Sequence, residues 1–391
     1  MAIPLAYNFR SLFVRKATTI ATALGVGLVV FVLAASMMLS NGIRETMVSS
    51  GSPANALILR KGSDTELASS IENKFFSVVQ AAPGVKRDGD GQPLSTGDVV
   101  VVVALDRLAS GPGQVSNVLV RGVMDNVFKL RPQVKLVQGR PAKPGTDEAI
   151  IGKGLLGGYG GLTLGGTFEL KKNRAVNVVG VFEAGGSSYE SEVWVNIDTL
   201  RASFGRDGLF SSITVQLDDP NKYEAFATVV ESDKQLGLES FREREYYDKQ
   251  SEGTSMVIST LGGITAVLFS VGAMIGAMIT MYGSVALRSR EIGTLRALGF
   301  SRFSILVAFL LESTALAALG GLAGTLVSLV CTFFKFSTMN YNTWQEVSFT
   351  FRASPGVMGF ALAAGCVMGV VGGFLPALRA AYTSPVDAMR A

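Results

Sequence analysis

Long apolar runs alternate with polar segments along this chain. The apolar runs cover residues 17–40, 254–287, 304–334 and 353–378. A helix needs about 20 apolar residues to cross the hydrocarbon core of a bilayer, and each run provides that length. The pattern therefore predicts a membrane protein with four transmembrane α-helices. It leaves one large polar segment, residues 41–253, between the first helix and the second.

Short β-type runs separated by turn residues predominate in this polar segment. The predicted strands are residues 99–105, 118–122, 175–182, 193–197 and 212–217, and the predicted helices are residues 63–80, 197–204 and 221–234. Such a mixture predicts an α+β domain with two lobes. The charged residues 241–250, together with residues 41–48, are predicted to extend the adjoining spans as helical stalks.

Basic residues are concentrated in the short polar segments that flank the spans. Residues 1–16, 288–303 and 379–391 contain nine basic and two acidic residues, whereas residues 41–253 contain 24 basic and 27 acidic residues. Because basic loops stay in the cytoplasm, these three segments and both termini are predicted to be cytoplasmic. Residues 41–253 and the loop 335–352 are then predicted to be extracytoplasmic. The net charge of +4 follows from this topology and predicts no nucleic-acid partner.

Residue types that carry much enzyme chemistry are missing or isolated. The sequence has no histidine, and Cys331 and Cys366 each lie within an apolar run. Zinc sites and catalysis by Ser-His or Cys-His pairs are therefore excluded within this chain. Residues 157–161 are glycine-rich, but no G-x-x-x-x-G-K-[ST] motif occurs, so we interpret them as a turn. The chain is predicted to bind no cofactor or metal of its own and not to be an enzyme.

A short basic helix pattern, residues 283–303, separates the second and third runs. Its apolar residues recur close to helical spacing, while its arginines lie mostly elsewhere around the helix. The run Arg290-Glu291-Ile292-Gly293, followed by residues 295–299 and Ser301, resembles the coupling segment of FtsX/MacB-type permeases of ABC transporters. The resemblance implies contact with an ATPase through Arg288, Arg290, Glu291, Ile292, Leu295 and Arg296. From the residues alone, a helix lying on anionic membrane lipid explains the pattern equally well.

Other stretches resemble the same family. Residues 147–152, 165–168 and 177–182 are similar in order to the extracytoplasmic core domain of MacB-type permeases, and residues 376–390 resemble the family's C-terminal ending. The resemblance implies mechanotransmission, in which a separate cytoplasmic ATPase binds ATP and Mg and its closure moves the spans and the external domain. Efflux, lipoprotein extraction and control of envelope enzymes are all compatible with it. The partners expected are a second permease copy or paralogue and a periplasmic adaptor or lipoprotein.

Glu312 is an ionisable residue well inside the third predicted span, about 15 Å along the helix from Arg302 at 1.5 Å per residue. One interpretation makes it a proton relay and the chain a proton-coupled secondary transporter. The other makes it a structural hydrogen bond or interhelical contact, as residues 309–313 resemble a family stretch that carries an acid without pumping protons. We favour the second interpretation. A regulator of envelope enzymes without transport remains a further alternative.

Small residues recur at four-residue steps within the spans. Among them are Gly272 and Gly276, Gly320 and Gly324, and Gly365 and Gly369. In lipid, close backbone contact through small residues is a main source of helix packing energy. These glycines are therefore predicted to pack helices together, either within one chain or across a dimer.

Overall fold

The computed structural model describes residues 16–108, 114–340 and 342–384, with side chains from residue 19 onward. The predicted basic segment 1–15 and most of the tail, residues 385–391, lie outside the described residues. Residue contacts divide the chain into two compact units. The helical unit comprises Met1–Asn41, Met256–Phe334 and Thr350–Ala391, and the sheet unit comprises Gly42–Ser255 and Lys335–Phe349.

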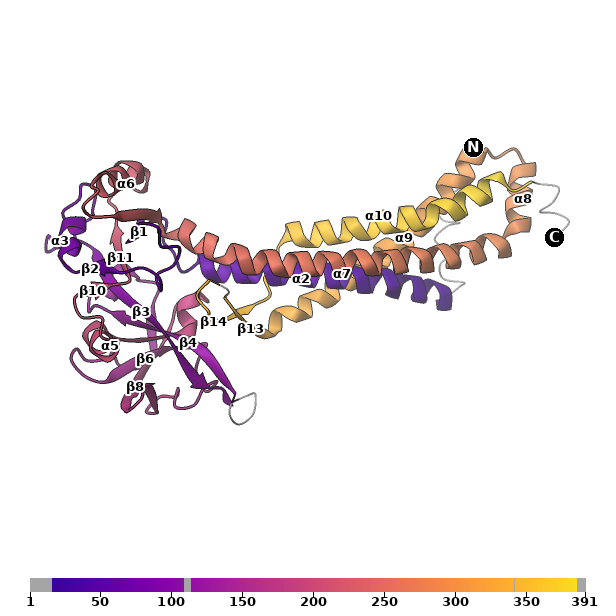
Figure 1. The fold of residues 1–391 in the computed structure, drawn as a ribbon. Coiled ribbons are helices and arrows are strands. Elements are labelled where there is room, and N and C mark those ends of the chain that lie inside the picture. The colour runs from indigo at the N-terminus through magenta and orange to yellow at the C-terminus, as the bar shows by residue number, and fades with distance from the viewer. Residues whose placement is uncertain (1–15, 109–113, 341, 385–391) are drawn as a thin grey trace. The chain divides into compact units, whose positions relative to one another are not determined.

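Four helices of the described residues are long and apolar enough to cross a membrane. They are α2 (Lys16–Val48), α7 (Glu243–Leu287), α9 (Arg302–Leu329) and α10 (Pro355–Tyr382), and they are labelled in Figure 1. The short helix α8 (Ser289–Ala297) joins α7 to α9, and a 3-10 turn, η4 (Val330–Phe333), follows α9. Helices α2 and α7 each cross a boundary between the two units without a break. The boundary lies between Asn41 and Gly42 in α2 and between Ser255 and Met256 in α7.

Local sequence explains where two of these helices begin. The Ser301 side chain accepts a hydrogen bond from the backbone N–H of Ser304 at 3.1 Å, which caps α9. Ser354 caps α10 in the same way, and Pro355 occupies the first helical position, where its missing N–H costs nothing. Gly299, at φ +92°, forms the turn after α8 in a conformation that other residues rarely adopt.

The sheet unit is built on a ten-stranded sheet. Its strands are β1 (Asn55–Arg60), β3 (Ser95–Asp106), β4 (Val115–Val123), β5 (Lys135–Gly139), β6 (Glu148–Gly152), β7 (Thr167–Lys171), β8 (Arg174–Glu183), β9 (Glu192–Asn196), β11 (Ser212–Gln216) and β12 (Leu238–Arg242). The order is β12-β1-β11-β3-β4-β9-β6-β8-β5, with β7 paired to β8. The pairs β4–β9 and β6–β8 are parallel, and the other pairs are antiparallel. The long strand β3 pairs with β11 along its first residues and with β4 along the rest, so it joins two halves of the sheet.

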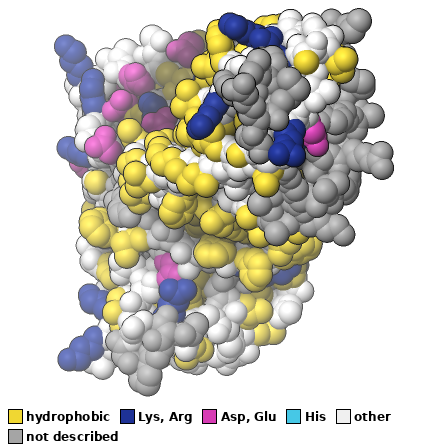
Figure 2. Space-filling view, turned by 90° about the vertical axis from the view of Figure 1, so that its right-hand side faces the viewer, with side chains coloured by type: hydrophobic (Ala, Val, Ile, Leu, Met, Phe, Trp, Pro, Cys, Tyr) yellow, Lys and Arg dark blue, Asp and Glu magenta, His cyan; other side chains and the backbone are white. Residues whose placement is uncertain are grey.

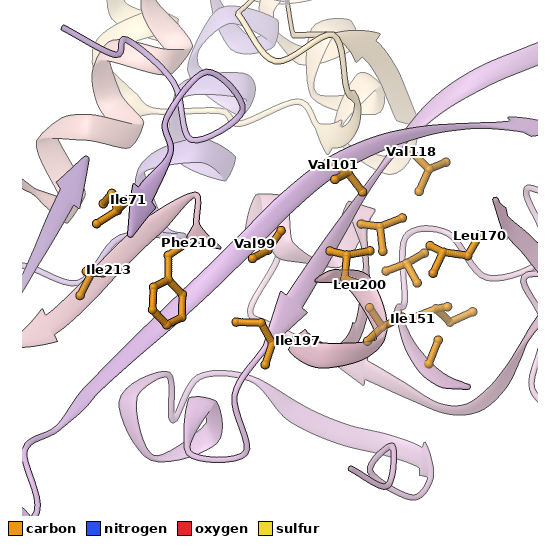
Figure 3. Packing of buried hydrophobic residues seen from close by; sticks show 14 of the residues in the cluster. Ile71, Val99, Val101, Val118, Ile151, Leu170, Ile197, Leu200, Phe210 and Ile213 are labelled. Atoms are coloured by element: carbon orange, nitrogen blue, oxygen red, sulfur yellow. The ribbon is translucent and has the colours of Figure 1, made fainter. Parts of the chain in front are cut away.

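Short helices and two small two-stranded sheets complete the sheet unit. They are α3 (Lys74–Gln80), α4 (Val127–Leu130), η2 (Ser188–Ser191), α5 (Ile197–Phe204), η3 (Pro220–Lys222), α6 (Tyr223–Ser232), the pair β2 (Ile71–Glu72) and β10 (Leu209–Phe210), and the pair β13 (Lys335–Met339) and β14 (Glu346–Thr350). Strand and helix side chains form its main hydrophobic core. Figure 3 shows Val118, Leu200 and Ile151 gathered there from β4, α5 and β6.

The fold class predicted from the sequence is confirmed. All five predicted strands exist, and the predicted helices 197–204 and 221–234 correspond to α5 and α6. The predicted helix 63–80 is wrong, because only α3 is helical within it. Ile71 instead pairs with Phe210 in the antiparallel β2–β10 sheet, and the Ser69 hydroxyl accepts a hydrogen bond from the backbone N–H of Arg60 at 3.0 Å. These tertiary contacts override the helical periodicity of the segment.

Candidate functional site

Helix α8 has one buried face and one exposed face. Ile292 is only 2% exposed and packs into a hydrophobic cluster with residues of α7, α9 and α10, including Val285, Phe309 and Ala377. The opposite face, which we call the outward face, consists of Arg290, Glu291, Thr294 and Leu298, all of them exposed. Among the predicted coupling residues, Leu295 and Arg296 are half-buried. Ile292 thus offers little surface to a partner in this conformation.

Arg288 connects the start of α8 to the interior of α9. Its Nη1 lies 2.9 Å from Glu312 Oε2 and its Nε lies 3.2 Å from Glu291 Oε2. The guanidinium also lies over the Phe309 ring, 5.3 Å from the centroid. Both Arg288 and Glu312 are more than nine-tenths buried. The Glu312 carboxylate therefore makes an interhelical contact, as the structural interpretation of this residue predicts. We call these three charged residues the Arg288 junction.

The packing glycines fall into two groups. A Cβ added at Gly320 or Gly324 would clash with backbone atoms of α2, and one added at Gly369 would clash with Ala317 of α9. A Cβ at Gly365 would lie 2.9 Å from a methyl group of Val30, again within the chain. These four glycines therefore pack the helices of one chain.

Gly272 and Gly276 on α7 form the second group. Both are exposed, and an added Cβ would meet nothing within 4 Å among the described residues. Their predicted packing role has no counterpart within the described part of this chain.

A buried ionic network lies in the sheet unit, and the sequence analysis missed it. It consists of Arg121, Arg131, Glu66, Asp98, Glu192 and Glu243. Arg121 on β4 donates two hydrogen bonds to Glu66, at 2.8 and 3.1 Å, and two to Glu192 on β9, at 2.8 and 3.0 Å. Two-point contacts of this kind fix geometry as well as supplying energy. A charged residue at the centre of an apolar strand, as in Asn117-Val118-Leu119-Val120-Arg121, is the sequence signal that was available.

Burial and ion pairing oppose one another in this network. Burial raises the pKa of Glu66, but the Arg121 charge and the hydrogen bonds from Arg121 and Ser212 outweigh it and hold that pKa below the ordinary glutamate value. Burial lowers the pKa of Arg121, and the charges of Glu192 and Glu66 raise it well above its usual range. The Arg121–Glu66 pair therefore stays ionised at neutral pH.

The second arginine of the network meets the first residue of α7. Arg131 Nη1 lies 2.9 Å from Asp98 Oδ2, within ion-pair distance, although no guanidinium nitrogen of Arg131 is directed well enough to donate a hydrogen bond. Its Nη2 lies 3.8 Å from Oε1 of Glu243. The guanidinium also lies over the Tyr189 ring, 4.9 Å from the centroid, which compensates in part for burial.

Glu243 ties the N-terminus of α7 to the segment that follows α2. Its Oε2 accepts hydrogen bonds from the Ser52 backbone N–H and from Asn55 Nδ2, both at 2.9 Å. An acid in the first turn of a helix also interacts favourably with the helix dipole. One turn further on, Asp248 of α7 accepts two hydrogen bonds from Arg44 of α2, at 2.7 and 2.8 Å. The two stalk helices are therefore held to one another and to the sheet within this unit.

The connection between α9 and α10 also belongs to the sheet unit. Glu346, the first residue of β14, is 7% exposed and accepts hydrogen bonds from Tyr159 at 2.9 Å and from Ser116 and Ser337. Arg107 Nη2 lies 3.0 Å from its Oε1. Burial raises the pKa of Glu346, but these hydrogen bonds and the Arg107 charge hold it below its usual value. The sequence predicts only a polar loop in residues 335–352, and the β13–β14 hairpin is a finding of the structure.

The described residues contain no group of three or more histidine, cysteine, aspartate or glutamate side chains arranged to hold a metal ion. The charged groups of the Arg288 junction and of the ionic network are instead engaged in ion pairs with each other.

Comparison with known proteins identifies the family. Residues 19–232 match the model of the MacB-like periplasmic core domain, and residues 263–385 match that of the FtsX-like permease C-terminal region. Over 233 residues the chain is 30% identical to the uncharacterised ABC transporter permease YknZ of Bacillus subtilis. The matched region covers 55% of this chain and 54% of that protein. Over 294 residues it is 30% identical to the macrolide export ATP-binding/permease protein MacB of Burkholderia thailandensis, covering 70% of this chain and 43% of that protein.

The chain thus spans about half the length of the curated relatives it matches. The two matched models follow one another in the order in which the sheet unit and the last three membrane helices occur in the sequence. The resemblance seen in residues 290–301 is confirmed by the second model, which contains them. Because the first model by itself matches more than half of the 391 residues, the protein belongs to the FtsX/MacB family of ABC transporter permeases.

Proposed function

We propose that this permease couples ATP hydrolysis by a partner ATPase to a change in the shape of its sheet unit, that is, mechanotransmission. The observation that carries the proposal is the two-sided character of α8. Its outward face is exposed to solvent, while Ile292 and the Arg288–Glu312 ion pair fix its other face to α7, α9 and α10. A helix held in this way transmits a displacement caused by the partner to the membrane helices.

The continuity of α7 supplies the second step. Its 45 residues correspond to about 67 Å at 1.5 Å per residue, more than twice the hydrocarbon thickness of a bilayer. It begins at Glu243, within the ionic network, and ends one residue before Arg288. A displacement of α8 is therefore expected to reach the sheet through an unbroken helix with a fixed attachment at each end.

The partners and location follow from the same proposal. The protein lies in the inner membrane of a bacterium. Both termini and α8 are on the cytoplasmic side, because the segments that flank the spans there are basic. ATP and Mg are bound by the cytoplasmic ATPase, since residues 1–391 contain no phosphate loop. A second permease copy or paralogue packs through Gly272 and Gly276, where an added Cβ would meet nothing within 4 Å among the described residues. Outside the membrane, the sheet unit acts on an adaptor, a lipoprotein or an envelope enzyme. Efflux, lipoprotein handling and envelope regulation are all compatible with this mechanism.

The proton-coupled alternative requires Glu312 to exchange protons during a transport cycle. Its carboxylate instead lies 2.9 Å from the buried guanidinium of Arg288, in an ion pair that joins α9 to the start of α8. This pairing supports the permease proposal.

The test is copurification of the ATPase with variants of the outward face. Glu291→Arg and Leu298→Asp change side chains that are 59% and 68% exposed, so the fold is expected to survive. Matched controls are Glu169→Arg and Val229→Asp, which make the same changes at exposed positions of the sheet unit. Burying one leucine contributes about 1.5 to 3 kcal/mol, so Leu298→Asp is expected to lower copurified ATPase and stimulated hydrolysis at least tenfold.

Both controls are expected to behave as the unmodified protein does. If the two outward-face variants retain the ATPase and its stimulated hydrolysis at the control level, α8 is not the docking element and the proposal fails.

A further inference from the structure

Two arginines of the helical unit lie over tyrosine rings at one end of α10. Arg302, the first residue of α9, is 4.8 Å from the centroid of the Tyr382 ring on α10. Arg379 of α10 is 5.7 Å from the centroid of the Tyr282 ring on α7. Arg379 and Tyr382 are three residues apart on one helix and therefore neighbours on its surface. Three helices thus bring two guanidinium groups to one turn of α10.

Unlike Arg288, these two arginines have no acidic partner among the residues that the structure describes. The ion pairs of the helical unit's described residues join Arg288 to Glu291 and to Glu312, and neither uses Arg302 or Arg379. Both arginines are exposed, and neither side chain donates a hydrogen bond to another described residue. Contact with a ring orients a guanidinium while its N–H donors stay available for a planar oxyanion.

The surroundings of the pair are apolar and exposed. Phe303, next to Arg302, is 72% exposed, and Leu375, one turn before Arg379, is 48% exposed. Figure 2, which looks onto the side of the structure where α8 lies in Figure 1, shows basic side chains next to hydrophobic ones. A phospholipid presents a phosphate beside acyl chains, which matches two arginines flanked by exposed apolar side chains. Tyrosine and arginine are also the residues enriched where a span leaves the bilayer.

We propose that Arg302 and Arg379, oriented by Tyr382 and Tyr282, bind the phosphate of an anionic phospholipid at the cytoplasmic surface of the membrane. The two guanidinium groups donate to the phosphate oxygens, and the acyl chains contact the side chains of Phe303 and Leu375. This site is separate from the outward face of α8, so its existence does not depend on whether the ATPase docks there.

The experiment measures lipid binding by the full-length chain in detergent. Dioleoylphosphatidylglycerol is titrated against the protein, with dioleoylphosphatidylcholine as the zwitterionic reference, and bound lipid is counted by native mass spectrometry. The variants are Arg302→Gln, Arg379→Gln and Tyr382→Leu, and the matched control is Arg60→Gln, which removes one exposed charge from the sheet unit. Each arginine variant is expected to bind phosphatidylglycerol about fivefold more weakly, equivalent to about 1 kcal/mol per arginine near a membrane surface.

Several outcomes would overturn this assignment. If Arg60→Gln weakens phosphatidylglycerol binding equally, the binding reflects general charge attraction. If Tyr382→Leu binds phosphatidylglycerol as the unmodified protein does, the contact between Arg302 and the Tyr382 ring plays no part. Displacement of the lipid by excess inorganic phosphate would indicate a site for soluble anions. Normal lipid binding by both arginine variants, with loss of the ATPase, would assign the surface to the protein partner.

Discussion

Removing one charge of the Arg288 junction tests how α8 is held to the spans. Glu312→Gln keeps the shape of the side chain but leaves the Arg288 guanidinium, 7% exposed, without its nearest carboxylate. Breaking one side of a buried ion pair costs about 3 to 5 kcal/mol. Because Glu291 still lies 3.2 Å from Arg288, we expect the lower end, about 3 kcal/mol.

The stalk pair Arg44–Asp248 supplies the matched control. It has good two-point geometry, but its side chains are 62% and 31% exposed. Exposed pairs contribute about 0 to 1 kcal/mol, so Asp248→Asn is expected to cost no more than about 1 kcal/mol. The assay is reversible unfolding in mixed micelles with increasing dodecyl sulfate, read as a free energy of unfolding for each variant.

A double variant separates a lost pair from an uncompensated charge. Replacing Arg288 by Met and Glu312 by Leu removes both buried charges, so its stability is expected to exceed that of Glu312→Gln and to lie close to that of the unmodified protein. With α8 loosened, Glu312→Gln is also expected to bind the ATPase but to transmit less of its stimulation. The reasoning is refuted if Glu312→Gln lowers the free energy of unfolding no more than Asp248→Asn does. It is also refuted if the double variant loses as much free energy of unfolding as its two single changes added together.

Two further perturbations probe the helix packing and the ionic network. Gly324→Ala places a methyl group against the backbone of α2 and is expected to destabilise the protein by about 1 to 2 kcal/mol in thermal unfolding. Gly359→Ala on α10, where an added Cβ meets nothing within 4 Å among the described residues, is expected to be neutral or slightly stabilising. Similar melting temperatures for the two variants would contradict the packing. Because the pKa of Glu66 is lowered in the folded state, its contribution to stability is complete above the unfolded pKa and is lost as the pH falls through the folded value. The melting-temperature difference between unmodified protein and Glu66→Gln should therefore be constant above about pH 5 and shrink on acidification, and a difference that grows at low pH would contradict this.

The sequence by itself determined the features that depend on local composition. Four apolar runs long enough for a bilayer leave the chain few alternatives to four membrane helices, because unpaired backbone groups are too costly in hydrocarbon. Short runs such as 99–105 and 212–217 identified strands of the sheet, since their β-branched residues and flanking turns act over a few residues. The segment 290–301 identified the family by its residues alone.

Tertiary structure decided which residues meet. Arg288 and Glu312 are 24 positions apart, and Arg121 and Glu192 are 71 apart, so no local pattern indicates that either pair forms. Ile292 fits a helical stripe equally well as a docking residue or as a core residue, and only the packing of α7, α9 and α10 around it selects the core. Residues 63–80 have a helical pattern, yet Ile71 lies opposite Phe210 in a two-stranded antiparallel sheet. In each case the deciding free energy comes from pairing charges and burying apolar side chains against distant parts of the chain, and it exceeds the small local preferences that a sequence displays.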